Sequence, residues 1–359
     1  MVLVSAYFSF VASLSTVPLA LAAAKWRYNG TGSIVVGEEW TVPELLYQIS
    51  PVVVSPFPGG THAELVSNLL DVHNQRLDMM DANQIDFMVL GCNSPCIQGI
   101  TDPVTAANTS VYVNNQLAAS ISNNTERFGG FASLAMHNAS FAALELKRAV
   151  KELGLLGAMI HGYQQSGPDG QTFLYYDQPE YDVFWKMVSD LDVPVYLHTR
   201  LDAQPILDLL YAHAPFLRGA PQGFSAGAAA HVLGLCVNGI FDRFPDVRLI
   251  VGHMGERIPS DLYRIDTEFS HTKTAMKENI TTYFKTNMYK TTSSDFSTSL
   301  LKFHTGEIGL DRIMYSTDYP KAYPPDGTAW LNSLRTALSK HELASLKREV
   351  AIKVLRLNN

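Results

Sequence analysis

Short apolar runs recur along the chain, and several of them end abruptly in polar residues. The run at 193–197 is followed at once by His198, and its length and its β-branched and aromatic residues indicate a buried strand. Similar runs end near Glu38, His253 and Asp318. The predicted strands cover residues 33–37, 84–91, 130–136, 157–161, 193–197, 247–251, 283–290 and 312–316.

Helical spacing of apolar residues fills the intervals between these strands. Leu65, Leu69 and Leu77, for example, lie on one face of a helix. Eight strands that alternate with helices over about 330 residues predict an α/β protein with one parallel sheet, closed into a (β/α)8 (TIM) barrel. The predicted helices cover residues 62–81, 111–128, 140–153, 180–191, 226–244, 259–270, 295–304, 329–339 and 342–355.

An open, doubly wound sheet is the alternative fold. Such a sheet normally carries a glycine-rich phosphate loop after its first strand. In this chain the first strand runs into Gly37, Glu38 and Glu39, and neither G-x-G-x-x-G nor a P-loop follows. Carboxylates at that position would repel a phosphate, so the barrel is favoured.

Composition narrows the class of protein. Of the 359 residues, 47% are hydrophobic and 17% charged, which allows a large core and argues against disorder. The net charge of −7 argues against a nucleic acid partner. The three cysteines are too few for a disulfide framework, and Cys92 and Cys96, four residues apart, are either a local bridge or two free thiols.

The N-terminus is typical of a secretory leader. Residues 1–24 carry no charged side chain, and small residues at 20–24 fit a signal-peptidase site. We therefore expect a signal peptide at 1–24, one barrel domain at 25–359 and a secreted protein with no membrane span after leader removal. An uncleaved anchor and a cytoplasmic location are the alternatives. Five Asn-x-Ser/Thr sequons are compatible with glycosylation, at Asn29, Asn108, Asn123, Asn138 and Asn279.

In a barrel, the residues that end the strands converge on one mouth. Glu38, His198 and Asp318 would then supply three ligands for one divalent metal ion, with His253 close by. This donor set suits Zn²⁺, Mn²⁺ or Mg²⁺. Each residue alone is better explained by a salt bridge or a helix cap, but the four together favour a catalytic site.

Several motifs resemble those of the amidohydrolase superfamily, in its branch of metal-dependent, non-oxidative aromatic acid decarboxylases. That branch includes the dihydroxybenzoate, γ-resorcylate, salicylate, 6-methylsalicylate and aminocarboxymuconate-semialdehyde decarboxylases. The similarity is strongest to fungal members. It rests on residues 93–99 (NSPCIQG), 196–200 (YLHTR), 239–245 (GIFDRFP), 252–256 (GHMGE), 263–266 (YRID) and 312–320 (RIMYSTDYP).

The resemblance implies a carboxy-lyase that removes CO₂ from a small ortho-hydroxy aromatic acid, in secondary metabolism or aromatic degradation. It implies that Glu38, His198 and Asp318 bind the metal, and that His253, paired with Glu256, lies beside the substrate. Asp318 is the expected proton donor to the ring carbon. A carboxyl group bound to a metal donates a proton well only if its pKa is raised, so the pocket must exclude water. A homodimer or homotetramer is expected.

The chain departs from the branch at two positions. Many members carry a second ligand two residues after the first, where this chain has Trp40. Many also have an aromatic residue after the Asp-Tyr-Pro turn, where this chain has Lys321. The absence of the second ligand limits the members of the branch that this chain can resemble. The lysine at position 321 leaves the identity of the substrate undetermined.

Two other functions compete with decarboxylation. A metal-dependent hydrolase of a lactone or amide could use the same barrel, with the metal activating water. Two-metal hydrolases of the superfamily usually carry His-x-His after strand one and a lysine ending strand four, whereas this chain has Glu38-Glu39-Trp40 and His161. A binding barrel without activity is the second alternative, and the four strand-end residues argue against it.

Overall fold

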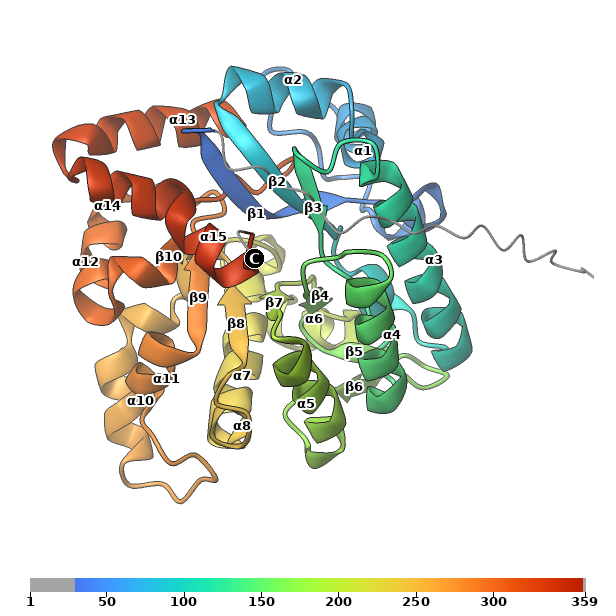
Figure 1. Cartoon of the computed structure of the whole chain (residues 1–359). Coiled ribbons are helices and arrows are strands. Elements are labelled where there is room, and N and C mark those ends of the chain that lie inside the picture. The colour runs from blue at the N-terminus through green and yellow to red at the C-terminus, as the bar shows by residue number, and fades with distance from the viewer. Residues whose placement is uncertain (1–29, 358–359) are drawn as a thin grey trace, which may run out of the picture.

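A barrel of parallel strands surrounded by helices makes up the protein (Figure 1). The structure is a computed structural model that describes residues 30–357. The predicted (β/α)8 barrel is confirmed. Its strands are β1 (Ser33–Trp40), β2 (Ile85–Cys92), β3 (Phe128–Gly130), β4 (Ala158–His161), β7 (Pro194–His198), β8 (Arg248–Val251), β9 (Met288–Thr291) and β10 (Ile313–Met314).

The helices lie outside the barrel, mostly between successive strands (Figure 1). Those named by the structure are α1 (His62–Leu70), α2 (Gln75–Ala82), α3 (Pro103–Ile121), α4 (Ala139–Lys151), α5 (Asp182–Leu191), α6 (Gln204–Tyr211), α7 (Gly223–Val237), α8 (Ile240–Arg243), α9 (His253–Glu256), α10 (Leu262–Phe269), α11 (Ile280–Thr286), α12 (Thr298–Ile308), α13 (Pro324–Ser333), α14 (Lys340–Ala344) and α15 (Val350–Leu355). A short hairpin of β5 (Gln164–Ser166) and β6 (Thr172–Leu174), absent from the predicted elements, follows β4.

Two junctions of the barrel lack a regular ladder. Strands β1 to β3 form one ladder and β4, β7, β8, β9 and β10 another, and one parallel bridge between Ala132 and Ala158 joins them. At the other junction, the amide of Val36 donates to Ser316 Oγ at 2.8 Å, and the amide of Glu39 donates to the Tyr319 carbonyl at 2.7 Å. A side chain thus closes the barrel just where Glu38 and Asp318 leave it.

Strand alternation divides the core into two layers. Ile34 and Val36 of β1 point into the barrel with Tyr196 of β7, whereas Val35 packs outward against the helices. The apolar side chains of α15 belong to the inner cluster, so the last helix covers one end of the barrel. Gly37 has a φ of +87°, and a Cβ there would lie 2.4 Å from the Tyr196 ring, so both its backbone and its contacts require glycine.

Several predicted elements differ from the structure. The helix expected at 111–128 is α3 (Pro103–Ile121), and the strand expected at 130–136 is β3 (Phe128–Gly130). The helix expected at 62–81 is two helices, because Asp71 accepts hydrogen bonds from the amides of Asn74 and Arg76 and thereby breaks the first and starts the second. The strand expected at 283–290 begins only at Met288. Residues 280–286 are helical because the Asn279 side chain caps them by accepting from the Thr282 amide.

The N-terminal predictions concern residues that the structure does not describe. The proposed leader at 1–24 and the sequon at Asn29 lie outside the described residues. Within 30–357, no helix combines the length and the apolar character needed to span a bilayer. Cys92 and Cys96 are joined by a disulfide, which decides between the two states that their spacing allows.

Candidate active site

Three ligand-type side chains meet at the carboxyl ends of three strands. One nitrogen of His198, one nitrogen of His253 and one oxygen of Asp318 all lie within 4.8 Å of one another. His198 ends β7, His253 follows β8, and Asp318 follows β10. Barrel geometry thus brings together residues that are far apart in the sequence, as strand-end chemistry in a barrel requires.

The two ring nitrogens of His198 differ, because one makes a hydrogen bond and the other has no partner among the described residues. Its Nδ1 donates to the Thr199 carbonyl at 2.9 Å, which places the proton on Nδ1 and the lone pair on Nε2. That Nε2 is buried and has no hydrogen-bond partner among the described residues. A buried, unpartnered imidazole lone pair beside a carboxylate and a second imidazole fits a divalent metal ion.

His253 and Glu256 form a close pair. His253 Nδ1 donates to Glu256 Oε1 at 2.6 Å, while His253 Nε2 lies 3.8 Å from Asp318 Oδ2. Burial opposes a charge on the imidazole, but the carboxylates of Glu256 and Asp318 outweigh it and raise the pKa of His253 well above its usual range. The imidazole is therefore protonated at neutral pH and faces Asp318.

Glu38 is fully buried next to this group, and its two oxygens are engaged by the segment that follows β10. Oε1 accepts from Ser316 Oγ at 2.6 Å and from the Thr317 amide at 2.8 Å. Oε2 accepts from Thr317 Oγ1 at 2.9 Å and from the Tyr319 amide. Burial raises the pKa of Glu38, and these hydrogen bonds counteract part of that effect.

The structure therefore brings all five predicted site residues into one region, but not in equal roles. His198, Asp318 and His253 form the group with metal-ligand spacing, whereas Glu38 lies outside that group. The role of Glu38 as a metal ligand stays a prediction. Its visible contacts hold the backbone that carries Asp318.

The backbone of the site is held in unusual conformations. His253, Glu256 and Asp318 have φ angles of 47°, 51° and 70°, in the left-handed region that side-chain-bearing residues rarely adopt. Such conformations persist only where the surrounding structure enforces them, and they concentrate at functional sites. Around Asp318, its carbonyl accepts from the amides of Lys321 and Ala322.

The sequence did not single out Glu39 as a site residue, yet it lies at the edge of the site. Its side chain is buried, and Oε1 accepts from the Ser94 amide at 3.1 Å, while Oε2 lies 3.7 Å from Lys321 Nζ. Ser94 Oγ in turn donates to the Thr199 carbonyl at 3.0 Å. Its position directly after Glu38 at the end of a strand could have indicated that it lies near the site.

His161, which ends β4, is a structural histidine. Its ring centroid lies 5.2 Å from that of His198, and its Nε2 donates to the Cys92 carbonyl at 2.9 Å. Burial and the neighbouring His198 lower the pKa of His161 well below its usual range, so the ring is neutral. It therefore supports the β2 exit loop.

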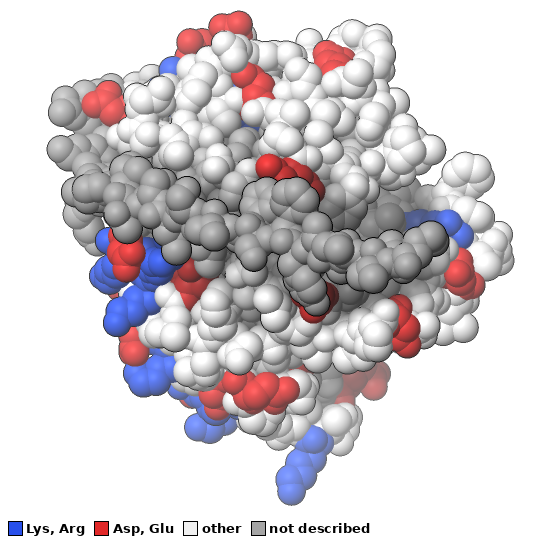
Figure 2. Space-filling view, turned by 90° about the vertical axis from the view of Figure 1, so that its right-hand side faces the viewer, with Lys and Arg blue, Asp and Glu red and all other residues white. Residues whose placement is uncertain are grey.

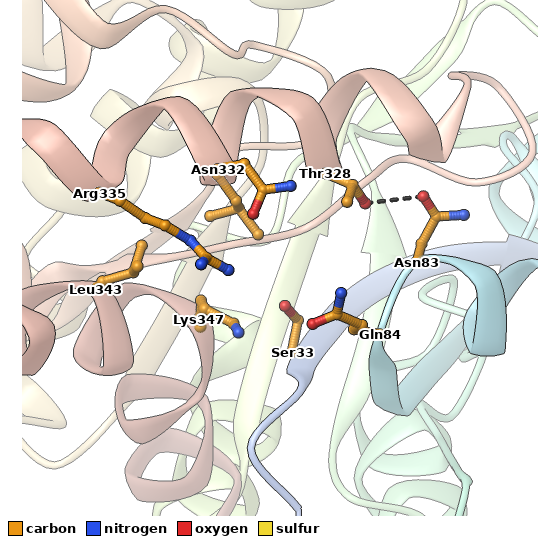
Figure 3. A pocket seen from close by; sticks show the side chains of 9 residues that line it. Ser33, Asn83, Gln84, Thr328, Asn332, Arg335, Leu343 and Lys347 are labelled. Carbon is orange, nitrogen blue, oxygen red and sulfur yellow. Dashed lines mark hydrogen bonds between the residues drawn. The ribbon is translucent and has the colours of Figure 1, made fainter.

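A small polar pocket lies at the opposite end of the barrel from this site (Figure 3). Ser33, at the start of β1, and Gln84, just before β2, face it together with Arg335 and Lys347. Neither a metal-ligating group nor a nucleophile paired with a base lines this pocket among the described residues. The reactive groups are therefore at the carboxyl end of the strands.

The surface face in Figure 2 is mostly uncharged. Its Lys and Arg residues lie mainly toward one edge, and its Asp and Glu residues are scattered. Among the described atoms of that face, no broad basic patch is visible.

The chain is similar in sequence to one family of known proteins. A family model described as "Amidohydrolase" matches residues 71–358. The γ-resorcylate decarboxylase of Rhizobium radiobacter is 36% identical over 331 residues, which cover 91% of this chain and 99% of that protein.

Two solved structures of similar sequence share the fold. The 2,6-dihydroxybenzoate decarboxylase from Rhizobium is 35% identical, with a TM-score of 0.84 over 91% of this chain and 99% of that one. The dihydroxybenzoic acid decarboxylase from a Polaromonas species, solved with bound manganese and the inhibitor 2-nitroresorcinol, is also 35% identical. Its TM-score is 0.85 over 91% of this chain and 98% of that one.

Proposed function

The chain belongs to the amidohydrolase family, and from that premise we propose that it is a metal-dependent, non-oxidative decarboxylase of a small ortho-hydroxy aromatic acid. The single observation that carries the proposal is the group of His198, His253 and Asp318, in which the buried His198 Nε2 lacks a partner among the described residues. The enzyme is thus a carbon–carbon lyase.

The substrate class follows from the ligand chemistry and from the relatives. A benzoate with an ortho hydroxyl presents two oxygens that can bind one metal ion together. The Rhizobium enzymes are named for γ-resorcylate, which is 2,6-dihydroxybenzoate and has this feature. We assign this chain to the same class, which includes 6-methylsalicylate, in secondary metabolism or aromatic degradation.

Manganese is the proposed ion among Mn²⁺, Zn²⁺ and Mg²⁺. His198 offers nitrogen and Asp318 offers oxygen, a mixed set that Mn²⁺ accepts. The similar Polaromonas enzyme was solved with manganese. When bound, a divalent ion there supplies positive charge that orients the acid and withdraws electron density from its ring.

The residues of this chain supply the proton. The carboxyl group of Asp318 delivers a proton to the ring carbon that bears the carboxylate. The bond between that carbon and the carboxylate then breaks, its electron pair returns to the ring, and CO₂ leaves. His253, protonated and 3.8 Å from Asp318 Oδ2, restores the proton to Asp318, and Glu256 keeps the imidazole oriented.

Hydrolysis of a lactone or amide is not favoured. The position that ends strand four holds His161, whose ring supports the Cys92 carbonyl rather than a metal group. Strand one carries Glu38 and Glu39 followed by Trp40, with no His-x-His pair. The chain therefore lacks the ligand set of a two-metal hydrolase.

The proposal is tested by CO₂ release from a panel of salicylates with manganese-loaded protein, followed by mass spectrometry. Hydrogen exchange gives a second test: the decarboxylated phenol is incubated with enzyme in D₂O, and ortho deuteration is followed by NMR. Wild type should label one position, and Asp318→Asn should lose rate roughly 10²–10⁴-fold as general acid catalysis requires. Labelling at the wild-type rate by Asp318→Asn would assign the proton to His253 instead, and His253→Asn is the matched variant.

Secretion is a separate proposal. It is supported by the uncharged residues 1–24 and by sequon asparagines Asn108, Asn123, Asn138 and Asn279, whose side chains are exposed. Sequencing the protein from its native host should give an N-terminus near Ala23 or Lys25. An intact Met1 on intracellular protein would contradict it.

A homodimer or homotetramer is the proposed assembly. Exposed apolar side chains on α6 and the following turn support it, since Leu209 is 82% exposed and Phe216 is 93% exposed. Light scattering on the eluting protein should give a mass of two or four chains, and a single-chain mass at micromolar concentration would contradict the proposal.

A further inference from the structure

Lys290 is a fully buried lysine that the proposed chemistry does not use. It lies on β9, and its side chain is 1% exposed. Its Nζ lies 2.5 Å from Nδ1 of His304 on α12, and Nε2 of His304 lies 3.0 Å from Oγ of Ser260. A chain of hydrogen bonds therefore joins β9, α12 and the short 3₁₀ turn Ile258–Ser260.

Lys290 and His304, the two basic side chains joined by these hydrogen bonds, are both neutral at neutral pH. Burial lowers the pKa of Lys290 to about 6, and burial together with the charge of Lys290 lowers that of His304 to about 3. The lysine amine thus donates to His304 Nδ1, and His304 Nε2 donates to Ser260 Oγ. Asp295, on the loop between β9 and α12, is the carboxylate that favours the charged lysine.

The turn next to Lys290 carries the His253–Glu256 pair. Residues 253–257 all have positive φ angles, and of these only Gly255 is a glycine. The left-handed conformation is unfavourable for a residue with a Cβ, so the turn does not hold this shape unaided. It needs contacts from outside.

Lys290 supplies contacts at the middle of that turn and just beyond its last residue. Its Cδ lies 3.4 Å from the point that a Cβ on Gly255 would occupy, so its methylene chain packs under the middle of the turn. Its amine reaches Ser260, just beyond the turn, through His304. The turn is therefore fixed from below and from its exit.

We propose that Lys290 is a positioning residue: through Gly255 and through His304 and Ser260, it holds the turn in the shape that aims His253 at Asp318. The proposal rests on the proposed function for its catalytic consequence. A neutral amine suits this task, because it completes the hydrogen bonds without adding a second cation near the protonated His253.

The experiment compares Lys290→Met and Ser260→Ala with wild type, all loaded with manganese. Met keeps the methylene packing but cannot donate to His304, and Ser260→Ala removes the other end of the chain. Lys302→Met is the matched control, because Lys302 is an exposed lysine on α12, the helix that carries His304. The readouts are kcat, KM, melting temperature and hydrogen–deuterium exchange of peptides covering 252–262.

In Lys290→Met, hydrogen–deuterium exchange should become faster only in peptides covering 252–262, and the melting temperature should stay the same or rise. The kcat should fall about 10–100-fold with little change in KM, as for a small misplacement of a catalytic group. Ser260→Ala should do the same more weakly, and the double variant should be no worse than Lys290→Met, because both break one chain. Lys302→Met should match wild type.

Unchanged exchange and kcat in folded Lys290→Met would overturn the proposal. A general fall in melting temperature with faster exchange throughout would also overturn it, because that result marks a merely structural lysine. If Lys290→Met does not fold, the local exchange of Ser260→Ala decides. If wild type decarboxylates no acid in the panel, the proposed function fails, while the exchange data still test the positioning of the turn.

Discussion

At the scale of single residues, the two nitrogens of His198 have different tasks. Nδ1 is fixed by the Thr199 carbonyl, which leaves Nε2 as a buried lone pair without a partner among the described residues. His198→Ala should therefore lose most bound metal, since loss of a ligand from a three-ligand site is severe. Metal analysis after dialysis measures this, with the exposed His213→Ala as control. Equal metal in both variants would show that the site is misassigned.

Glu38 is the residue whose contacts point to a task besides metal binding. Its oxygens accept four hydrogen bonds from residues 316–319, so the carboxylate holds the segment that presents Asp318. In Glu38→Gln the amide nitrogen cannot accept, and at least one buried donor loses its acceptor. We expect the free energy of unfolding to fall by roughly 1–3 kcal/mol.

Urea unfolding of metal-free Glu38→Gln separates this structural effect from metal binding. A loss of stability in the absence of metal supports the hydrogen-bonding role. Unchanged stability combined with lost metal would instead identify Glu38 as a ligand only.

At the scale of elements, the junction between β10 and β1 depends on a side chain. No ladder joins the two strands, and Ser316 Oγ accepts from the Val36 amide and donates to Glu38 in its place. Ser316→Ala should lower the free energy of unfolding by roughly 1–3 kcal/mol, because a buried amide and a buried carboxylate each lose a partner.

Thermal or urea unfolding measures the effect of Ser316→Ala. Ser122→Ala is the control, since that exposed hydroxyl donates only to the Ala119 carbonyl of its own helix end. It should change stability by no more than about 0.5 kcal/mol. Equal stability of the two variants would mean that other contacts close the barrel.

At the scale of the whole molecule, Lys290 makes stability depend on pH. The unfolded chain holds the lysine proton up to a pKa near the ordinary value of 10.5, whereas the folded chain releases it above about 6. Because the unfolded state binds the extra proton between these values, this group makes folding more favourable as pH rises from 6 to 10.

Lys290→Met removes this dependence. At pH 7 the variant should gain stability on the order of 4 kcal/mol, less the lost hydrogen bond, and the gain should shrink toward pH 10. Unfolding midpoints measured from pH 6 to pH 9.5 for variant and wild type check this. A constant difference across that range would mean that the buried lysine keeps its charge.

The sequence by itself determined the barrel and the set of residues at its mouth. Strand and helix periods are local signals of burial, and polar residues that end apolar runs mark the strand ends. For that reason His198, His253 and Asp318 could be named before their geometry was known. The same local signal failed at 280–286, where a capping side chain made a helix out of residues with strand character.

The tertiary structure alone decided which partner each of these residues has. Glu38 meets Thr317 across 279 positions of sequence, and the lysine that supports the His253 turn reaches it through α12. A side chain's type shows that it needs a hydrogen-bond partner or a charge, but the path of the chain determines which group supplies it. The roles of Glu38 and Lys290 were therefore invisible in the sequence, because burial and hydrogen bonding depend on residues that only folding brings together.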